Sequence, residues 1–414
     1  MSESPGKVLM LVENHFPGDV RVKNEADILT AAGYFVTVIA LQGKSETSIS
    51  KVVDNIHVYA VPKVTLFTKT RKENASGLQH VWMRAVAFIG YAWEYLYFTT
   101  ACFVMSLYVA VKHGFDVIHA HNPPDTLFLV AAVYKLAGKK FVFDHHDLSP
   151  ELYQSRYQAD KGFVTIVLGL LEKASLKLAD ITIATNDSYR AIQIERGKVK
   201  PENVFVVRNG PNLKRVNYCT PSERLRRMNK TILCYVGALN PQDGVDYLLR
   251  SLRDLVCKLN RKDFYCVIMG SGDSLEDLRK LARELDLDGY VELPGYVSEE
   301  DLMSNLSAAD ICVDPDPSSP LNDVSTWIKI MEYMAMGKPI VTYDLKETHW
   351  SAQDAALYVK PNNELEFAQA IVKLMDSPEL RIQMGEFGRK RVEHELKWEI
   401  VGQNLVRAYK ALLG

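Results

Sequence analysis

The sequence predicts an α/β protein of two doubly wound, Rossmann-like domains that face each other across a cleft. Short apolar runs alternate with amphipathic helical segments along almost the whole chain, the pattern of parallel sheets covered by helices on both faces. The alternation stops at a polar, basic segment, residues 211–229, and then starts again. The 414 residues also suit two domains of about 200 residues each better than one core.

The first half contains six apolar runs that we expect to be strands. Helical segments lie between them, and several end near Gly or Asp, as helices commonly do. The expected strands are residues 7–13, 35–41, 116–121, 140–146, 181–185 and 204–210. Together they define an N-terminal domain over residues 1–210.

The second half repeats the pattern after the connector. Residues 245–259 and 275–287 read as crossover helices between parallel strands. The expected strands are residues 231–237, 264–270, 290–295, 311–315 and 339–344. We therefore expect a linker at 211–229, a C-terminal domain at 230–395 and a last helical segment at 396–414. In such sheets ligands bind beyond the carboxyl ends of the strands.

Composition excludes some functions and favours a compartment. A net charge of −2 gives no basic field for nucleic acid. The six cysteines are scattered without a C-x-x-C pair, which is typical of reduced thiols in a cytosolic protein. The first residues lack the basic and apolar regions of a secretory signal. We expect a cytoplasmic protein.

One segment, residues 85–111, is unusually apolar and contains a single charge, Glu94. Its length allows a transmembrane helix. However, an expected strand of the same domain follows almost at once, at residues 116–121. Basic residues upstream fit a helix lying on an anionic membrane surface. An interfacial helix, a core helix and a true span all remain open.

Histidines and aspartates gather at the ends of two expected strands, in the sequences HAHNPPD and DHHD. H-x-H together with Asp can bind metal, so a metallohydrolase is one alternative; structural polar contacts and a substrate-facing site are the others. The strand-end position favours a substrate-facing site. His146 beside Asp147 is the pair best placed for a polarised, catalytic imidazole, and His121 would lie on the substrate side. No metal is expected.

Three glycine-containing loops follow expected strands. The loop at 13–22 holds Gly18, with Arg21 in the first turn of the next helix, and can present backbone N–H groups to a phosphate or sugar. Gly237, Gly270 and Gly272 follow two strands of the second half and would allow a nucleotide to approach the backbone. None of these loops is a P-loop or a dinucleotide fingerprint.

The segment DVSTWIKIMEYMAMGKPIV, residues 323–341, reads as a buried helix followed by a strand. Lys329 and Glu332 lie three residues apart, on one helix face, among apolar neighbours. Buried charges are costly unless they are paired or face a ligand. Lys329 near the helix N-terminus suits a phosphate, where it would also stabilise the leaving group, and Glu332 can accept the hydroxyls of a ribose.

The chain resembles the GT-B glycosyltransferases of family 4, which are retaining and use nucleotide sugars. The resemblance extends over nearly the whole length, through FPGDVRVKNEADILTAAGYFVTVIAL, DVIHAHNPPD, VFDHHDLSPELY, EKASLKLADITIATND, VFVVRNG, VELPGYVSEEDL and LSAADICVDP, and is most specific at KIMEYMAMGKPIV. It implies that Glu332 holds the ribose, that the loops at Gly270–Gly272 and Tyr296 bracket the nucleotide, and that His146 lies by the transferred sugar. It also implies that the C-terminal helix returns to the first domain.

Two departures from the family pattern affect the donor site. Where the family often has a first glutamate, this chain has Val324, and Asp323 is the nearest acid that could contact the donor sugar. A basic pair common after the first strand of the second domain is also missing, with Ala238 and Asp243 near those places. Lys329 then becomes the main cation for the diphosphate, with Arg21 or Arg208 as helpers.

The expected function is transfer of a sugar from a nucleotide-diphosphate sugar to an acceptor hydroxyl, with no cofactor. The apolar segment suggests a lipid-linked acceptor in surface polysaccharide synthesis, at the inner face of the plasma membrane. The residues assigned to the acceptor or sugar side are Gly18, Arg21, His121 and Asn209. A nucleotide-sugar epimerase, the metallohydrolase and a non-catalytic nucleotide-sugar binder are the alternatives.

Overall fold

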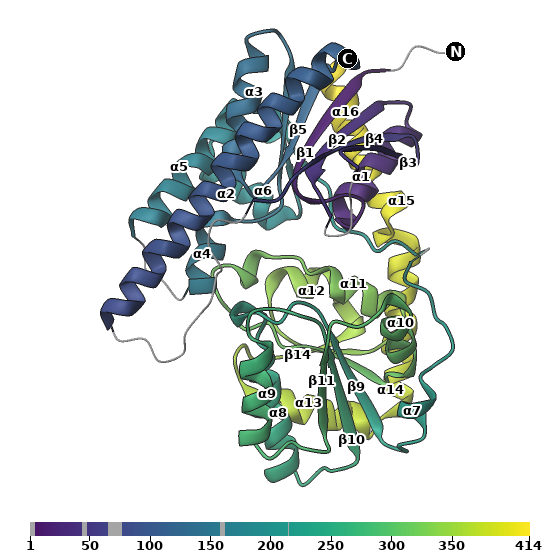
Figure 1. Ribbon diagram of the computed structural model, residues 1–414. Coiled ribbons are helices and arrows are strands. Elements are labelled where there is room, and N and C mark those ends of the chain that lie inside the picture. Colours follow the sequence, from purple (N-terminus) through teal and green to yellow (C-terminus); the bar gives the residue numbers. More distant parts are fainter. Residues whose placement is uncertain (1–4, 44–47, 65–76, 158–161, 214) are drawn as a thin grey trace. The chain divides into compact units, whose positions relative to one another are not determined.

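The computed structural model describes residues 5–43, 48–64, 77–157, 162–213 and 215–414, which form two compact units (Figure 1). Unit 1 comprises Met1–Gln154, Asp160–Val207 and Gly402–Gly414; unit 2 comprises Ser155–Ala159 and Arg208–Val401. The segment 211–229, expected to be a linker, therefore lies within unit 2, and only the last thirteen residues return to unit 1.

Unit 1 is built on an eight-stranded sheet in the order β3-β4-β2-β1-β5-β6-β7-β8. All neighbouring strands are parallel except β3 and β4, which form an antiparallel pair at one edge. The strands are β1 (Lys7–His15), β2 (Phe35–Leu41), β3 (Ser50–Val53), β4 (Ile56–Val61), β5 (Val117–His121), β6 (Lys140–His145), β7 (Ile181–Ala184) and β8 (Val204–Val206). The sequence analysis missed β3 and β4.

The helices of this half pack on the sheet and join its strands. They are α1 (Val20–Ala31), α2 (Gly77–Lys112), α3 (Phe128–Lys135), α4 (Ser149–Tyr157), α5 (Phe163–Leu178) and α6 (Asp187–Glu195), together with the last helix, α16 (Gln403–Leu413). One core cluster contains Phe98 and Val109 of α2, Val130 of α3 and Leu176 of α5 with strand side chains. Residues Ala92–Lys112 are long and apolar enough to cross a membrane, yet one side of this stretch lies in that core.

Unit 2 contains a six-stranded, fully parallel sheet in the order β11-β10-β9-β12-β13-β14. The strands are β9 (Thr231–Val236), β10 (Phe264–Met269), β11 (Val291–Gly295), β12 (Ile311–Asp314), β13 (Ile340–Tyr343) and β14 (Ala356–Val359). The first five are the expected ones, and the sequence analysis missed β14.

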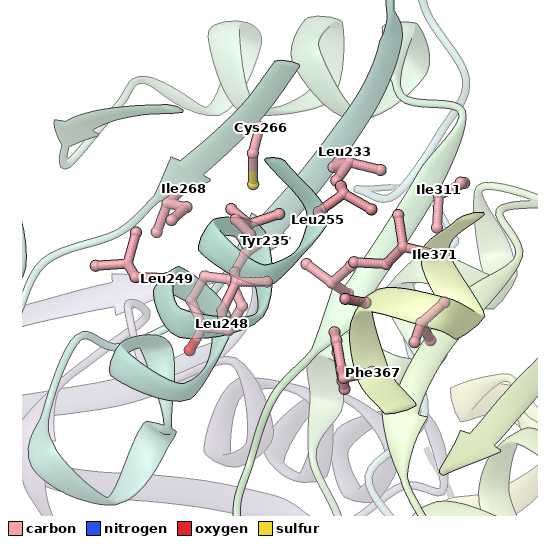
Figure 2. Packing of buried hydrophobic residues seen from close by; sticks show 14 of the residues in the cluster. Leu233, Tyr235, Leu248, Leu249, Leu255, Cys266, Ile268, Ile311, Phe367 and Ile371 are labelled. Atoms are coloured by element: carbon pink, nitrogen blue, oxygen red, sulfur yellow. The ribbon is translucent and has the colours of Figure 1, made fainter. Parts of the chain in front are cut away.

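Helices cover both faces of the second sheet. They are α7 (Glu223–Arg226), α8 (Val245–Cys257), α9 (Leu275–Glu284), α10 (Glu299–Ala308), α11 (Ile328–Ala335), α12 (Lys346–Ala352), α13 (Glu364–Met375), α14 (Pro378–Arg391) and α15 (Trp398–Val401). Figure 2 shows one core, in which Leu248 of α8 and Phe367 and Ile371 of α13 surround Tyr235 and Leu233 of β9. The other face carries a second core cluster, which includes residues of α11 and residues that directly follow α14.

Each sheet has a point where successive connections leave in opposite directions. In unit 1 it lies at β1, between β2 and β5, and in unit 2 at β9, between β10 and β12. Ligands of doubly wound sheets bind beyond the carboxyl ends of strands at such points. The loops after β1 and β5, and after β9 and β12, are therefore the first places to look for a site.

Candidate functional site

The site region of unit 1 begins at the carboxyl ends of β1, β5 and β6. Asp19 caps α1, and its carboxylate accepts the backbone N–H of Val22 at 3.1 Å. This cap starts α1 close to the end of β1 and sets Arg21 in its first turn. His121 lies opposite Asp144 in the β5–β6 register, and His146 follows β6 directly.

Arg21 points into unit 1 and not toward solvent. Its Nη2 lies 3.1 Å from Asp144 Oδ1 and 3.0 Å from Glu25 Oε1, both fully buried carboxylates. Its Nε donates to His146 Nε2 at 3.0 Å. Because a guanidinium only donates, His146 Nε2 accepts and a neutral His146 carries its proton on Nδ1. Arg21 thus fixes the orientation and the tautomer of the imidazole that the sequence singled out.

Glu25, His121, Asp144 and His146 bring four possible metal-ligand atoms within 4.8 Å of one another. Burial raises the pKa of Glu25 well above its usual value and lowers that of His121 to about 3. Burial alone would raise the pKa of Asp144, but Arg21 and His146 bring it well below the usual value. The cluster therefore already contains a buried cation, the Arg21 guanidinium, beside its carboxylates. Arg21 already pairs with both carboxylates, and the set fits a metal poorly.

Asn122 holds the turn that carries His146 and Asp147, a role that the sequence analysis missed. Its Oδ1 accepts the backbone N–H groups of His146 at 2.6 Å and Asp147 at 3.2 Å. Its Nδ2 donates to the Asp147 carbonyl at 2.7 Å. Burial raises the pKa of the Asp147 carboxyl. The sequence feature that could have indicated this role is the position of Asn122 directly after His121, in HNPPD.

Two residues assigned to the acceptor side have other surroundings. Gly18 is exposed and packs against the ring of His15, where an added Cβ would come within 1.9 Å of the imidazole. A larger residue at position 18 would therefore require the exposed His15 ring to move. Asn209 lies in unit 2, two residues beyond the end of unit 1. The helper candidate Arg208 pairs with Glu347 at 3.1 Å and stacks on Trp350.

In unit 2 the loops after β9 and β10 pack backbone against backbone. A Cβ on Gly270 would lie 1.7 Å from the Gly237 carbonyl oxygen, and one on Gly272 would lie 2.3 Å from the Leu239 carbonyl oxygen. These glycines let the two loops approach each other. From the sequence we had expected these glycines to let a nucleotide approach the backbone.

Lys329 occupies a different setting from the one expected. Its ammonium lies 2.9 Å from Asp314 and 2.8 Å from Asp316, two fully buried carboxylates at the end of β12. It also sits over the ring of Tyr235, 4.8 Å from the centroid. Burial, reinforced by Asp314, raises the pKa of Asp316 well above its usual value. Lys329 therefore already has anionic partners of its own.

Glu332 lies one turn further along α11 and is also buried. The Arg215 guanidinium donates to Glu332 Oε1, and Arg215 also lies 3.7 Å from Glu299. Burial raises the pKa of Glu332, against the opposing effect of Arg215. The sequence analysis missed Arg215, which stands in the polar segment between the two expected domains. A ligand hydroxyl on Glu332 would share it with this guanidinium.

The remaining donor-side candidates lie on loops of unit 2. Tyr296 follows β11 and is 84% exposed, so its ring is accessible. Asp323 belongs to a short 3₁₀ turn, Asn322–Val324, and accepts the hydroxyl of Ser318 at 3.1 Å. Its other oxygen has no hydrogen-bond partner among the described residues.

Two family models match this chain. Residues 19–215 match the model described as Glycosyltransferase Family 4, and residues 230–377 match that of Glycosyl transferases group 1. The first match ends within the polar segment 211–229, and the second begins directly after it.

Curated relatives and solved structures agree with these models. The chain is 28% identical to alpha-D-kanosaminyltransferase of Streptomyces kanamyceticus, over 46% of this chain and 48% of the relative. It is 27% identical to a GDP-mannose-dependent monoacylated alpha-(1-6)-phosphatidylinositol monomannoside mannosyltransferase of Corynebacterium glutamicum, over 48% and 53%. The chain thus spans about half the length of these relatives. Anabaena HepE in complex with UDP-glucose has a similar fold, with a TM-score of 0.71, 16% identity and 98% and 100% coverage.

Proposed function

Since the chain belongs to the family 4 glycosyltransferases and has the GT-B fold, we propose that it transfers a sugar from a nucleotide-diphosphate sugar to an acceptor hydroxyl, with retention at the anomeric carbon. The observation that carries this proposal is Glu332. It is a buried carboxylate on α11, and α11 follows the point in unit 2 where the connections of the sheet diverge. Of the alternatives, the metallohydrolase does not explain this placement.

In the proposed donor site Glu332 accepts the ribose hydroxyls, with Arg215 beside it. The diphosphate would lie at the N-terminus of α11, where free N–H groups and the helix dipole favour an anion. Lys329 contributes positive charge near this helix end, although Asp314 and Asp316 balance most of it. Gly237, Gly270 and Gly272 shape the loops on the other side, and Tyr296 and Asp323 complete the donor-side set. The bound UDP-glucose in HepE supports a donor of this class.

In the proposed reaction His146 contacts the transferred sugar. Since Nε2 accepts from Arg21, the Nδ1–H remains to donate to a sugar hydroxyl. Asp147 follows in the turn held by Asn122, and His121 supports His146 at 3.2 Å. A leaving-group phosphate oxygen takes the proton of the acceptor hydroxyl, so no protein base is required.

For the acceptor we propose a lipid-linked glycan at the inner face of the plasma membrane. A pocket lies at the carboxyl ends of β1 and β2, beside α2, with Glu13, Glu94, Tyr95 and Phe98 among its lining residues. Carboxylates hydrogen-bond sugar hydroxyls, and aromatic rings pack on sugar faces. The phosphatidylinositol mannoside named for the Corynebacterium relative is an acceptor of this kind.

Calorimetric titration with UDP, GDP and ADP tests the donor site. Glu332→Ala should weaken the preferred nucleotide by roughly 1–3 kcal/mol, because it removes a charge-assisted ribose contact. Glu292→Ala is the matched control, since Glu292 likewise pairs with an arginine, Arg224, of the segment before β9. We expect the control to bind as the wild type does. Equal affinity of Glu332→Ala and wild type would refute the assignment.

The reaction itself is tested with a radiolabelled donor and membrane extracts. Label in an acceptor establishes transfer, whereas label in an isomerised donor establishes an epimerase. Nucleotide binding with neither product would favour the non-catalytic binder, the alternative suggested by Val324 and the missing basic pair.

A further inference from the structure

The exposed side of α2 is an apolar stripe. Its exposed large hydrophobic side chains fall on one helix face when the chain turns by about 100° per residue. They are Trp93, Leu96, Val104, Leu107, Tyr108 and Val111. Phe98, Cys102 and Val109 point the other way and lie in the core of unit 1. The residues of the stripe are therefore not the ones that pack α2 onto the sheet.

Two neighbouring helices carry matching stripes. On α5 the exposed residues are Phe163, Ile166 and Leu170, and the same spacing continues to two exposed lysines, Lys173 and Lys177. On α3 and directly after it, Leu129, Val133 and Leu136 are exposed. We call the exposed apolar residues of α2, α3 and α5 the apolar helix face.

The three helices lie side by side on one face of the sheet. They come before β5, β6 and β7, which follow one another in the sheet, so right-handed connections place them on the same side. All three contribute to one core cluster, α3 contacts both α2 and α5, and Figure 1 shows them together. Their stripes therefore form one broad surface, larger than the scattered apolar residues normal for a protein surface.

The charges on this surface have one sign. Lys112 at the end of α2, with Lys173 and Lys177 on α5, is exposed. Among the described side chains of the three helices the carboxylates are Glu94 and Glu172, and neither is exposed. A membrane with anionic lipids offers both an apolar interior and the matching negative headgroups.

We propose that the apolar helix face docks on an anionic lipid bilayer. Leu, Val and Phe side chains would enter the acyl boundary, while Trp93 and Tyr108 suit the interface and the lysines suit the headgroups. The same face of a second copy would supply no exposed carboxylate for these lysines from the described side chains of α2, α3 and α5. The inference rests on the surface and not on the proposed reaction, although α2 also lines the proposed acceptor pocket.

Vesicle co-sedimentation of the full chain tests the proposal. We expect binding to vesicles of phosphatidylcholine mixed with phosphatidylglycerol, weaker binding to phosphatidylcholine alone, and a loss between about 0.1 M and 1 M salt. Val104→Glu with Ile166→Glu should reduce the partition coefficient at least about tenfold, since each buries a charge. Lys173→Gln and Lys177→Gln should each reduce it about fivefold.

The chain offers matched controls. Val104 is 61% exposed and Ile166 is 62% exposed; Val52 on β3 and Ile382 on α14 are 61% and 62% exposed and lie off these helices. Val52→Glu with Ile382→Glu should leave vesicle binding unchanged. Nucleotide titration of every variant checks that unit 2 is intact. If the wild type binds no nucleotide, that result counts against the proposed reaction and not against the proposed membrane surface.

Three outcomes would overturn the proposal. They are no sedimentation with either vesicle, equal binding to neutral and anionic vesicles, and equal losses in the test and control pairs. A dimer in sedimentation velocity that Val104→Glu with Ile166→Glu dissociates, without vesicle binding, would identify a second copy as the occupant instead.

Discussion

Asp125 is a carboxylic acid enclosed beneath the turn that carries His146. Asn122 Nδ2 donates to its Oδ1 at 3.2 Å, and the Ser149 hydroxyl donates to its other oxygen. Burial raises its pKa to about 6, even though His145 and Ser149 act in the opposite direction. A proton on Asp125 is therefore held more tightly in the folded state than in the unfolded chain. The same Asn122 side chain holds the His146 turn, so this acid belongs to the support of the proposed catalytic histidine.

The raised pKa predicts a pH-dependent stability difference between wild type and Asp125→Asn. The contribution of Asp125 is fully present below the unfolded pKa of about 3.8 and is lost as the pH rises through about 6. Wild type should therefore gain about 1 kcal/mol relative to Asp125→Asn between pH 7 and pH 5. Hydrogen-exchange protection of β5 and β6 in both proteins measures this difference. A difference that stays constant over the range would contradict the prediction.

Single residues also show what a sequence can and cannot predict about a site. Arg21 and Lys329 were correctly singled out as unusual cations, but each lies between two buried carboxylates. The partner Glu25 can be predicted from the sequence, because it lies four residues from Arg21 on the same helix. Asp144 and Asp314 are not predictable in this way, because they lie on strands that only the fold brings beside Arg21 and Lys329. Choosing between a ligand and an internal carboxylate required the three-dimensional neighbours.

At the scale of elements, the donor side of unit 2 depends on how closely two loops approach. Gly270 has a φ of +152°, and its Cα faces the Gly237 carbonyl oxygen. Gly289 has a φ of +81°, but nothing lies within 4 Å of where its Cβ would be. Substituting Gly289 therefore measures the cost of the backbone conformation alone, whereas substituting Gly270 adds the cost of a steric clash.

Gly270→Ala should destabilise unit 2 by about 3 kcal/mol or more, since its methyl group would collide with backbone that cannot move independently. Gly289→Ala should cost about 1 kcal/mol, the penalty for a positive φ alone. Urea unfolding measures both, and nucleotide titration should show weaker binding only for Gly270→Ala. Equal costs for the two variants would mean that the loops separate easily.

The elements themselves were predictable where their pattern was strong. Eleven of the fourteen strands in the described part of the chain fall on apolar runs recognised in the sequence, because strands buried on both faces read as continuous apolar segments. The missed strands, β3, β4 and β14, lie at or next to sheet edges, and β3 and β14 are partly exposed. Edge strands have weaker apolar patterns because water covers part of them. For α2, the apolar sequence predicted a helix but did not decide whether its outer side faces protein, a membrane surface or the interior of a bilayer.

At the scale of the whole molecule, the last residues of the chain complete the first unit. Tyr409 of α16 is fully buried, and its hydroxyl lies 3.0 Å from His119 Nδ1. Its ring meets Tyr34 edge to face, with centroids 5.3 Å apart. Apolar periodicity predicted a helix here, but an amphipathic helix can pack on any open sheet face; only the family resemblance assigned it to the first domain. Unit 1 is therefore incomplete until residue 409 has been synthesised.

This arrangement predicts that Tyr409→Ala weakens unit 1 selectively, although the residue follows unit 2 in sequence. Loss of the buried ring should cost about 3–5 kcal/mol, and Tyr409→Phe, which removes only the hydroxyl, about 1 kcal/mol. Phe367→Ala, which removes a fully buried ring from the core of unit 2, is the reciprocal control. Hydrogen exchange followed by mass spectrometry reports on both units in one sample. Protection should fall in β1 and β5 for Tyr409→Ala and in β9 and β12 for Phe367→Ala. A Tyr409→Ala protein that loses protection in β9 and β12 to the same extent would mean that the two units unfold as one.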